Sequence, residues 1–255
     1  MHRFYIEPAQ SQNALLTLSE RESHHATKVL RVRQGERVAA LDGAGSEFIC
    51  EVQDASREAV SLKVLQKNSH PPLPCQLTLC QAIPKGKTMD SIVQKATELG
   101  AYRVIPLLSE RTVPQLEEDS ASTKVEKWRA IAIESIKQCG SAWLPKIELP
   151  QTPAAYLASG ERSELSLLAT LQNDARHPRV HMAEFVEERK RLPKSLAVWV
   201  GPEGDFTPAE INAIRSAGAL PITLGSLILR SETAAIYCLA VLNYELQAPR
   251  QPLGA

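Results

Sequence analysis

The order of apolar and polar residues divides the chain into two regions with different patterns. Short apolar segments typical of strands occur in the first region at residues 3–6, 37–41, 48–52 and 60–65. Between them, Ser19 followed three residues later by Glu22 is the pattern of a capping box, which predicts a helix from residue 20 onward. Residues 1–70 are therefore expected to form a small β-rich domain with one helix.

The second region alternates between strand and helix patterns. Apolar runs predict strands at residues 77–82, 103–108, 165–171, 196–200 and 222–224. Helical patterns and end signals predict helices at residues 88–99, 122–139, 207–218 and 234–246. This alternation is typical of an α/β domain with a mostly parallel sheet. The last helix is apolar on nearly all sides, so we expect the domain or another subunit to cover it.

A proline-rich segment separates the two regions. Residues 70–74 hold three prolines, which cannot continue a helix or a central strand and which form a stiff, extended spacer. We therefore expect one domain at residues 1–71 and a second at residues 75–255.

The overall composition and net charge of the chain exclude few classes of binding partner. The 255 residues include 29 Lys and Arg and 29 Asp and Glu, so bulk charge neither favours nor excludes nucleic acid. The five cysteines have an odd count and a loose spacing that argue against a disulfide framework or a zinc site. The longest strongly apolar stretch, 234–242, is far shorter than the ~20 residues of a membrane helix. We expect a cytoplasmic protein without a bound metal or a membrane partner.

Two glycine-bearing loops follow predicted strands of the second region, at residues 201–206 and 224–234. Open parallel sheets bind ligands at the carboxyl ends of their strands, and glycine lets the backbone approach a ligand closely. Neither loop has the GxGxxG or Walker A pattern, and Glu203 would repel phosphate, so a phosphate-free, cationic ligand suits them better. A tight strand-to-helix turn without any ligand explains the same composition and stays open.

Arg230 lies beside the second loop and is the candidate for a functional cation. An ion pair with Glu203 or Glu232 is the structural alternative. The next residue, Ser231, is a possible cap of the last helix.

A basic run in the first region is the clearest concentration of positive charge. Its members are Arg21, His24, His25, Lys28, Arg31, Arg33 and Arg37. Spacing of i, i+4 and i+7 would place His24, Lys28 and Arg31 on one helical face, where with Arg3 they could contact RNA phosphates. A solvated helix face, offset by nearby glutamates, is the alternative.

Six motifs in order resemble those of a known family. They are His24-His25 with Val29-Leu30-Arg31, Gln94 to Gly100, Ser109-Glu110-Arg111, Gln138-Cys139-Gly140, Gly201-Pro202-Glu203-Gly204, and Leu224-Gly225 with Ile228-Leu229-Arg230 and Glu232-Thr233. Over essentially its whole length, the chain resembles the ribosomal RNA small subunit methyltransferase E family. These are 16S rRNA (uracil-N3)-methyltransferases of the SPOUT superfamily.

The resemblance implies a PUA-like, RNA-binding β-barrel followed by a SPOUT domain with a trefoil knot, a rare exception to unknotted topology. It implies S-adenosylmethionine as the cofactor, held largely by backbone groups of three loops. By position, the cofactor-binding residues are Thr170, Leu171, Val200, Gly201, Pro202, Glu203, Gly204, Leu224, Gly225, Leu227 and Leu229.

The implied reaction methylates N3 of a uridine in 16S rRNA, presented free or in the small ribosomal subunit. Arg230 is our candidate catalytic residue, because a nearby cation would stabilise the uracil anion as it forms. The residues assigned to RNA contact are Arg3, His25, Lys28, Arg31 and Arg33. The resemblance also implies a homodimer.

Several positions depart from the family pattern. Asp205 stands where the family usually has Gly, and Leu227 where it usually has Arg; Lys137 and Ser141 replace a usual Glu and Arg. Two alternatives therefore stay open. The chain could methylate another RNA target or a ribose 2′-hydroxyl, or it could be a catalytically inactive rRNA-binding or assembly protein.

Overall fold

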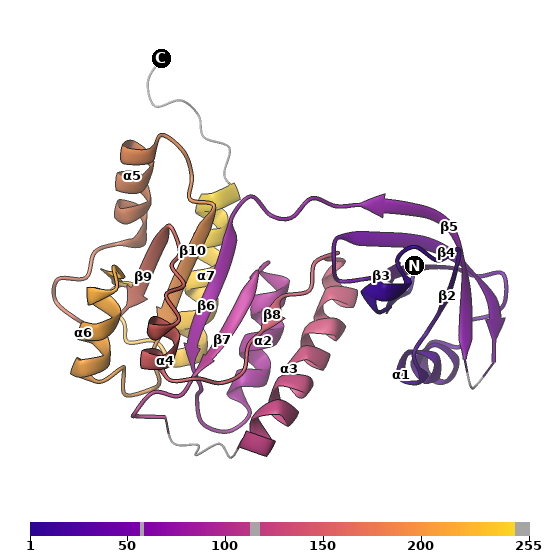
Figure 1. Cartoon of the computed structure of the whole chain (residues 1–255), viewed down its shortest axis with the longest axis horizontal. Coiled ribbons are helices and arrows are strands. Elements are labelled where there is room, and N and C mark those ends of the chain that lie inside the picture. The colour runs from indigo at the N-terminus through magenta and orange to yellow at the C-terminus, as the bar shows by residue number, and fades with distance from the viewer. Residues whose placement is uncertain (57–58, 113–117, 248–255) are drawn as a thin grey trace. The chain divides into compact units, whose positions relative to one another are not determined.

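A computed structural model describes residues 1–56, 59–112 and 118–247 of the chain (Figure 1). The chain divides into two compact units. The first consists of Met1–Pro72 with Ala132–Leu144, and the second of Leu73–Ile131 with Pro145–Ala255. Each unit has its own sheet, and each is described below by itself.

The first unit is built on a five-stranded sheet with the order β1-β3-β4-β5-β2. Its strands are β1 (Arg3–Tyr5), β2 (Leu15–Thr17), β3 (Arg37–Leu41), β4 (Ser46–Ala55) and β5 (Val60–Ser69). β1 is parallel to β3 and the other pairs are antiparallel. All four predicted strands form, and β4 and β5 are longer than their apolar segments because cross-strand pairing extends them. β2 was not predicted, since three residues carry too little periodicity.

The helix of this unit differs from the prediction. Ser19 caps α1 (Glu20–His24) as expected, with its Oγ accepting from the Glu22 N–H at 3.3 Å. Glu22 does not complete a capping box; its carboxylate is buried and accepts from the Tyr5 N–H at 3.1 Å. The chain then continues as a π-helix over His25–Leu30 and ends at Arg31, which has a left-handed φ of 55°. A short 3-10 helix, η1 (Pro8–Gln10), joins β1 to β2.

The second unit confirms the α/β class and the mostly parallel sheet. Its six strands have the order β11-β9-β10-β6-β7-β8, and every pair is parallel. The strands are β6 (Gln76–Ala82), β7 (Arg103–Leu107), β8 (Lys146–Ile147), β9 (Leu165–Ala169), β10 (Ser195–Val200) and β11 (Leu220–Ile222). Two predicted strands have wrong bounds. β9 ends two residues earlier than predicted, and β11 both begins and ends two residues earlier, with Pro221 tolerated because the strand is at the edge of the sheet.

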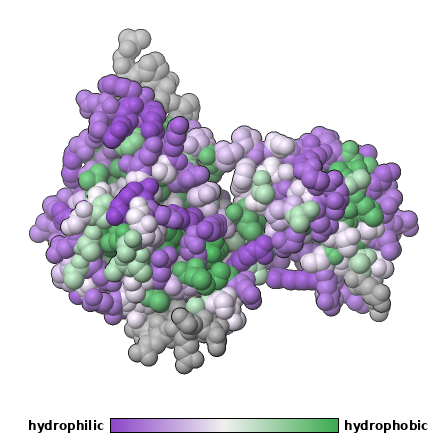
Figure 2. Space-filling model, viewed as in Figure 1, coloured by the Kyte–Doolittle hydropathy of each residue, from purple (hydrophilic) through white to green (hydrophobic). Residues whose placement is uncertain are grey.

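Helices lie on both faces of this sheet. The helices of this unit are α2 (Thr88–Glu98), α4 (Pro153–Ala158), α5 (Pro178–Arg189), α6 (Pro208–Ser216) and α7 (Ser231–Gln247), with the first part of α3 (Glu118–Cys139), whose last residues belong to the first unit. α2 and α7 pack together behind β6 and β10, whereas α4 and α6 lie in front (Figure 1). The capping box of Thr207 and Glu210 forms as predicted. α5 was not predicted because its sequence lacks an apolar face, and its surface is largely hydrophilic in Figure 2.

The final helix is less enclosed than its composition suggests. α7 buries Ala234, Ala235, Cys238, Leu239, Leu242 and Leu246. Tyr237 and Tyr244 are exposed, the latter by 73%. Within the described ranges, no helix is both long and apolar enough to cross a membrane.

Candidate functional site

Three loops meet at the carboxyl ends of β9, β10 and β11 and enclose a cavity of about 190 Å³. The cavity is lined by residues 169–172, 200–203, 205, 223–225, 227–229, 231 and 234. All predicted cofactor-binding residues except Gly204 are in this lining, so the fold brings together the loops that the sequence singled out. Gly204 lies beside it, and its carbonyl accepts from the guanidinium of Arg111.

The first glycine loop is closed on itself. A Cβ on Gly201 would lie 2.9 Å from the Asp205 Oδ1 and 3.1 Å from the Phe206 nitrogen, so a side chain there would require this part of the loop to shift. The Asp205 N–H donates to the Pro202 carbonyl at 2.9 Å, and Asp205 itself has a left-handed φ of 61°. Asp is one of the few side chains that tolerate this conformation.

The Asp205 side chain joins two of the three loops. Its Oδ1 accepts from the Phe206 N–H at 2.7 Å. Its Oδ2 accepts from the Thr170 hydroxyl at 3.3 Å, across to the loop that follows β9. The carboxylate is therefore fixed at the wall of the cavity by a neighbour in the chain and by a residue from another strand.

Ser231 connects the first loop to the sheet and to α7. It is the first residue of α7 and does not act as the N-cap considered from the sequence. Its hydroxyl donates to the Gly201 carbonyl at 2.8 Å and accepts from the Gln81 amide at 2.9 Å. Sequence reasoning missed Gln81, although a polar residue inside the apolar run 77–82 was a signal for a buried polar contact.

Ser231→Ala is expected to destabilise the protein by about 1–3 kcal/mol, because it leaves the buried Gln81 amide and the Gly201 carbonyl without their shared partner. The free energy of unfolding in urea measures this loss. Ser226→Ala is the control: Ser226 is exposed in the second loop, and its replacement should change stability by less than about 0.5 kcal/mol. Equal stability of the two variants would contradict the structural role of Ser231.

The second loop, between β11 and α7, is open to solvent. Gly225 has a φ of +112°, which side chains rarely adopt. Leu227 and Ile228 are 75% and 79% exposed. The loop therefore presents apolar side chains and backbone groups at the mouth of the cavity. Leu227, which stands where the resemblance implies an arginine, is one of these apolar side chains.

The charges of the cavity lining are all negative. Among the lining residues, the charged ones are Glu203, which is exposed, and Asp205, which is half-buried. An acidic lining around a glycine-bearing backbone fits the phosphate-free cationic ligand that the sequence suggested and opposes a nucleotide phosphate. S-adenosylmethionine, a sulfonium cation without phosphate groups, has this chemistry.

Arg230 stands at the junction of the second loop and α7. Its carbonyl accepts from the Ala234 N–H at 2.8 Å, so its backbone is held by the first turn of the helix. The side chain is exposed. Among the ion pairs of the described residues, none joins Arg230 to Glu203 or Glu232.

The predicted RNA-contact residues belong to the first unit and do not form the expected helical stripe. The π-helix changes the spacing of side chains along His25–Leu30, and the left-handed Arg31 ends it, so the i, i+4, i+7 rule fails here. Arg3 donates to the Lys137 carbonyl at 3.4 Å and packs against Gly140. Lys28 and Arg33 are exposed.

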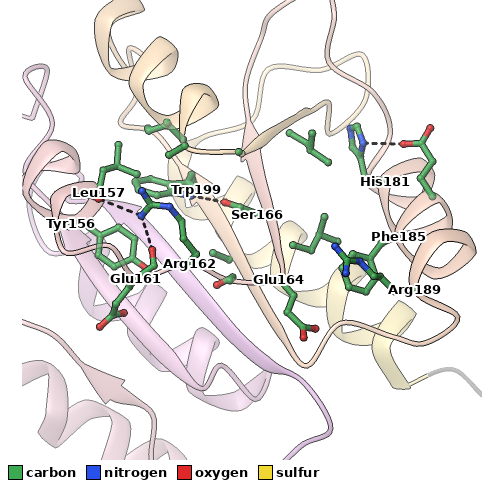
Figure 3. Close-up of a pocket in the computed structure, with 18 of the residues that line it drawn as sticks. Tyr156, Leu157, Glu161, Arg162, Glu164, Ser166, His181, Phe185, Arg189 and Trp199 are labelled. Atoms are coloured by element: carbon green, nitrogen blue, oxygen red, sulfur yellow. Dashed lines mark hydrogen bonds and ion pairs between the residues drawn. The ribbon is translucent and has the colours of Figure 1, made fainter.

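A second cavity, of about 560 Å³, lies toward the amino ends of β9 and β11 (Figure 3). Its acidic side chains already have partners within the protein. Glu164 pairs with Arg191 at 2.7 Å, and the hydrogen bond from Arg191 lowers the pKa of Glu164 to about 2. Glu161 pairs with Arg103 at 2.6 Å. Although this cavity is larger, it contains none of the predicted site residues, and the three-loop cavity is the better candidate site.

Two known protein families match this chain, one in each of the two regions that the sequence patterns predict. The RNA methyltransferase PUA domain family matches residues 18–65. The RNA methyltransferase domain family matches residues 71–243, more than half of the chain.

Individual relatives match over nearly the full length. Ribosomal RNA small subunit methyltransferase E of Synechocystis is 31% identical, with 97% of this chain and 78% of the relative covered. The protein of the same name from Bacillus subtilis is 28% identical, with 98% and 99% covered.

Solved structures have the same fold. The ribosomal RNA small subunit methyltransferase E from Neisseria gonorrhoeae, bound to S-adenosyl methionine, superposes with a TM-score of 0.83 at 27% identity, covering 96% of this chain and 98% of that one. A putative methyltransferase from Legionella pneumophila in complex with the same cofactor has a TM-score of 0.85 at 28% identity and the same coverage.

Proposed function

Because this chain belongs to the ribosomal RNA small subunit methyltransferase E family, we propose that it transfers a methyl group from S-adenosylmethionine to N3 of a uridine in 16S ribosomal RNA. The observation that carries this proposal is the cavity of three loops at the carboxyl ends of β9, β10 and β11. Its lining contains acidic and no basic side chains, which suits a sulfonium donor.

Eleven residues are assigned to the cofactor. They are Thr170, Leu171, Val200, Gly201, Pro202, Glu203, Gly204, Leu224, Gly225, Leu227 and Leu229, of which all but Gly204 line the cavity. The two glycines of the lining, Gly201 and Gly225, leave backbone groups uncovered by a Cβ, which supports binding largely through the backbone. The bound donor supplies an activated methyl group on its sulfonium.

The protein's part in the reaction is to position the acceptor and to stabilise charge. Alignment of two reactants in one site can lower a barrier by several kcal/mol. The imide proton would pass from N3 of uracil to solvent, so that negative charge develops on the ring. The N–CH3 bond would then form as the S–CH3 bond of the donor breaks, with a neutral thioether as the leaving group. We assign stabilisation of this charge to Arg230, whose exposed guanidinium is not engaged by a carboxylate of the described residues.

The first domain, at residues 1–71, is assigned to RNA binding, and the domain at residues 75–255 to catalysis. His25, Lys28, Arg31 and Arg33 remain the proposed RNA contacts, with Arg3 in a supporting position because it binds the Lys137 carbonyl. The target base must leave its stack to reach a buried donor. The exposed Tyr237 and Tyr244 of α7 support a homodimer. Membership of the family supports a SPOUT knot around the site and action in the cytoplasm, on free rRNA or on small subunits.

Mass mapping of 16S rRNA from a strain that lacks this gene tests the proposal. Loss of one base methyl from a uridine, restored by the wild-type gene, is the expected result. Loss of a ribose methyl would instead favour the 2′-hydroxyl alternative. Unchanged 16S rRNA would favour another RNA target or an inactive rRNA-binding protein.

A further inference from the structure

We propose that Asp205 makes the three-loop cavity selective for charge, so that it prefers the cationic methyl donor S-adenosylmethionine to its product, S-adenosylhomocysteine. This inference rests on the proposed function. It follows from the charges of the lining and from the way in which one of them is fixed.

The donor and the product differ by one methyl group and one positive charge. When the methyl group leaves, the sulfonium becomes a neutral thioether, while the adenosine and amino-acid parts are unchanged. Shape alone discriminates weakly between two such ligands, because one methyl in a pocket changes affinity only modestly. A fixed negative charge in the lining discriminates through the Coulomb attraction that only the donor has.

Asp205 is such a fixed charge. Its two oxygens accept from the Phe206 N–H at 2.7 Å and the Thr170 hydroxyl at 3.3 Å, so the carboxylate cannot rotate away from the wall. The backbone of Asp205 is also fixed: its φ is left-handed, and its N–H donates to the Pro202 carbonyl. Each carboxylate oxygen still has a free lone pair, so these bonds orient the charge without neutralising it.

Glu203 provides the comparison. It lines the same cavity but is exposed, and no hydrogen bond or ion pair from the described residues fixes its carboxylate. Water and salt screen an exposed, mobile charge more effectively than a half-buried, oriented one. The preference for a cation is therefore expected to come mainly from Asp205, at the position where the backbone conformation itself favours glycine.

Binding of the two ligands to the full-length protein, measured by calorimetry, tests the inference without turnover. We expect the wild type to bind S-adenosylmethionine about tenfold more tightly than S-adenosylhomocysteine. Asp205→Asn, which keeps the shape and tolerates the left-handed backbone, should remove most of this ratio. It should do so by weakening donor binding while product binding changes less than about twofold. The ratio should also fall as salt is added.

Thr170→Val removes the hydrogen bond that helps to fix Asp205 and leaves the charge in place. It should therefore lower the ratio of the two affinities, but less than Asp205→Asn, which removes the charge itself. Glu203→Gln should reduce the ratio less than Asp205→Asn does. Equal affinities of the wild type for donor and product, or a parallel loss of both in Asp205→Asn, would overturn charge selection while leaving the proposed function intact. A wild type that binds neither ligand would overturn both.

Discussion

Arg230→Ala is expected to retain S-adenosylmethionine binding and to lower kcat for 16S rRNA methylation by about 10²–10³-fold. That is the usual cost of removing one preorganised group that stabilises developing negative charge. Cofactor affinity should change little, because Arg230 is outside the lining of the cavity. Calorimetry gives the affinity, and methyl incorporation from a labelled donor into undermethylated small subunits gives the rate.

Two further variants make the Arg230 result specific. Arg230→Lys keeps a positive charge and should recover part of the rate, because a point charge still stabilises the anion without the guanidinium geometry. Arg189→Ala removes another exposed arginine, from α5, where it pairs with Glu188 at 3.2 Å, and should leave kcat unchanged. Wild-type turnover in Arg230→Ala would exclude this residue from the mechanism.

Lys137→Met is expected to destabilise the first unit by about 3–5 kcal/mol, because it leaves the buried Glu22 carboxylate without its cation. Glu22 and Lys137 are only 4% and 8% exposed, and Lys137 Nζ lies 2.7 Å from Glu22 Oε1. The same carboxylate accepts from the Tyr5 N–H, so the pair connects the first strand of the unit, its helix and the end of α3. The free energy of unfolding in urea, followed by circular dichroism, measures the loss.

The other partner of Lys137 provides the control. Glu134 lies 2.9 Å from the same ammonium but is 46% exposed in its side chain, so Glu134→Gln should cost less than about 1 kcal/mol. The double variant Glu22→Gln with Lys137→Met removes both charges and keeps an acceptor for the Tyr5 N–H. It should be more stable than Lys137→Met alone. If the double variant is no more stable, an uncompensated buried charge is not the cause.

The sequence by itself determined the features that depend on neighbouring residues. The capping box of Thr207 and Glu210 was readable because both bonds join residues three positions apart. The parallel sheet followed from apolar runs alternating with helical patterns. The glycine loops and their place after strands were also local signals, and their preference for a cation followed from Glu203 and the absence of phosphate-binding motifs.

The tertiary structure alone decided which distant groups meet. Glu22 carries the local pattern of a capping box, yet its carboxylate accepts from Lys137, 115 positions away, and from the Tyr5 N–H, because the fold brings these two donors beside it. Gln81 and Ser231 are 150 positions apart and become partners only when β6 and α7 pack. Periodicity and capping report contacts within a few residues, whereas long-range hydrogen bonds depend on which strands become neighbours.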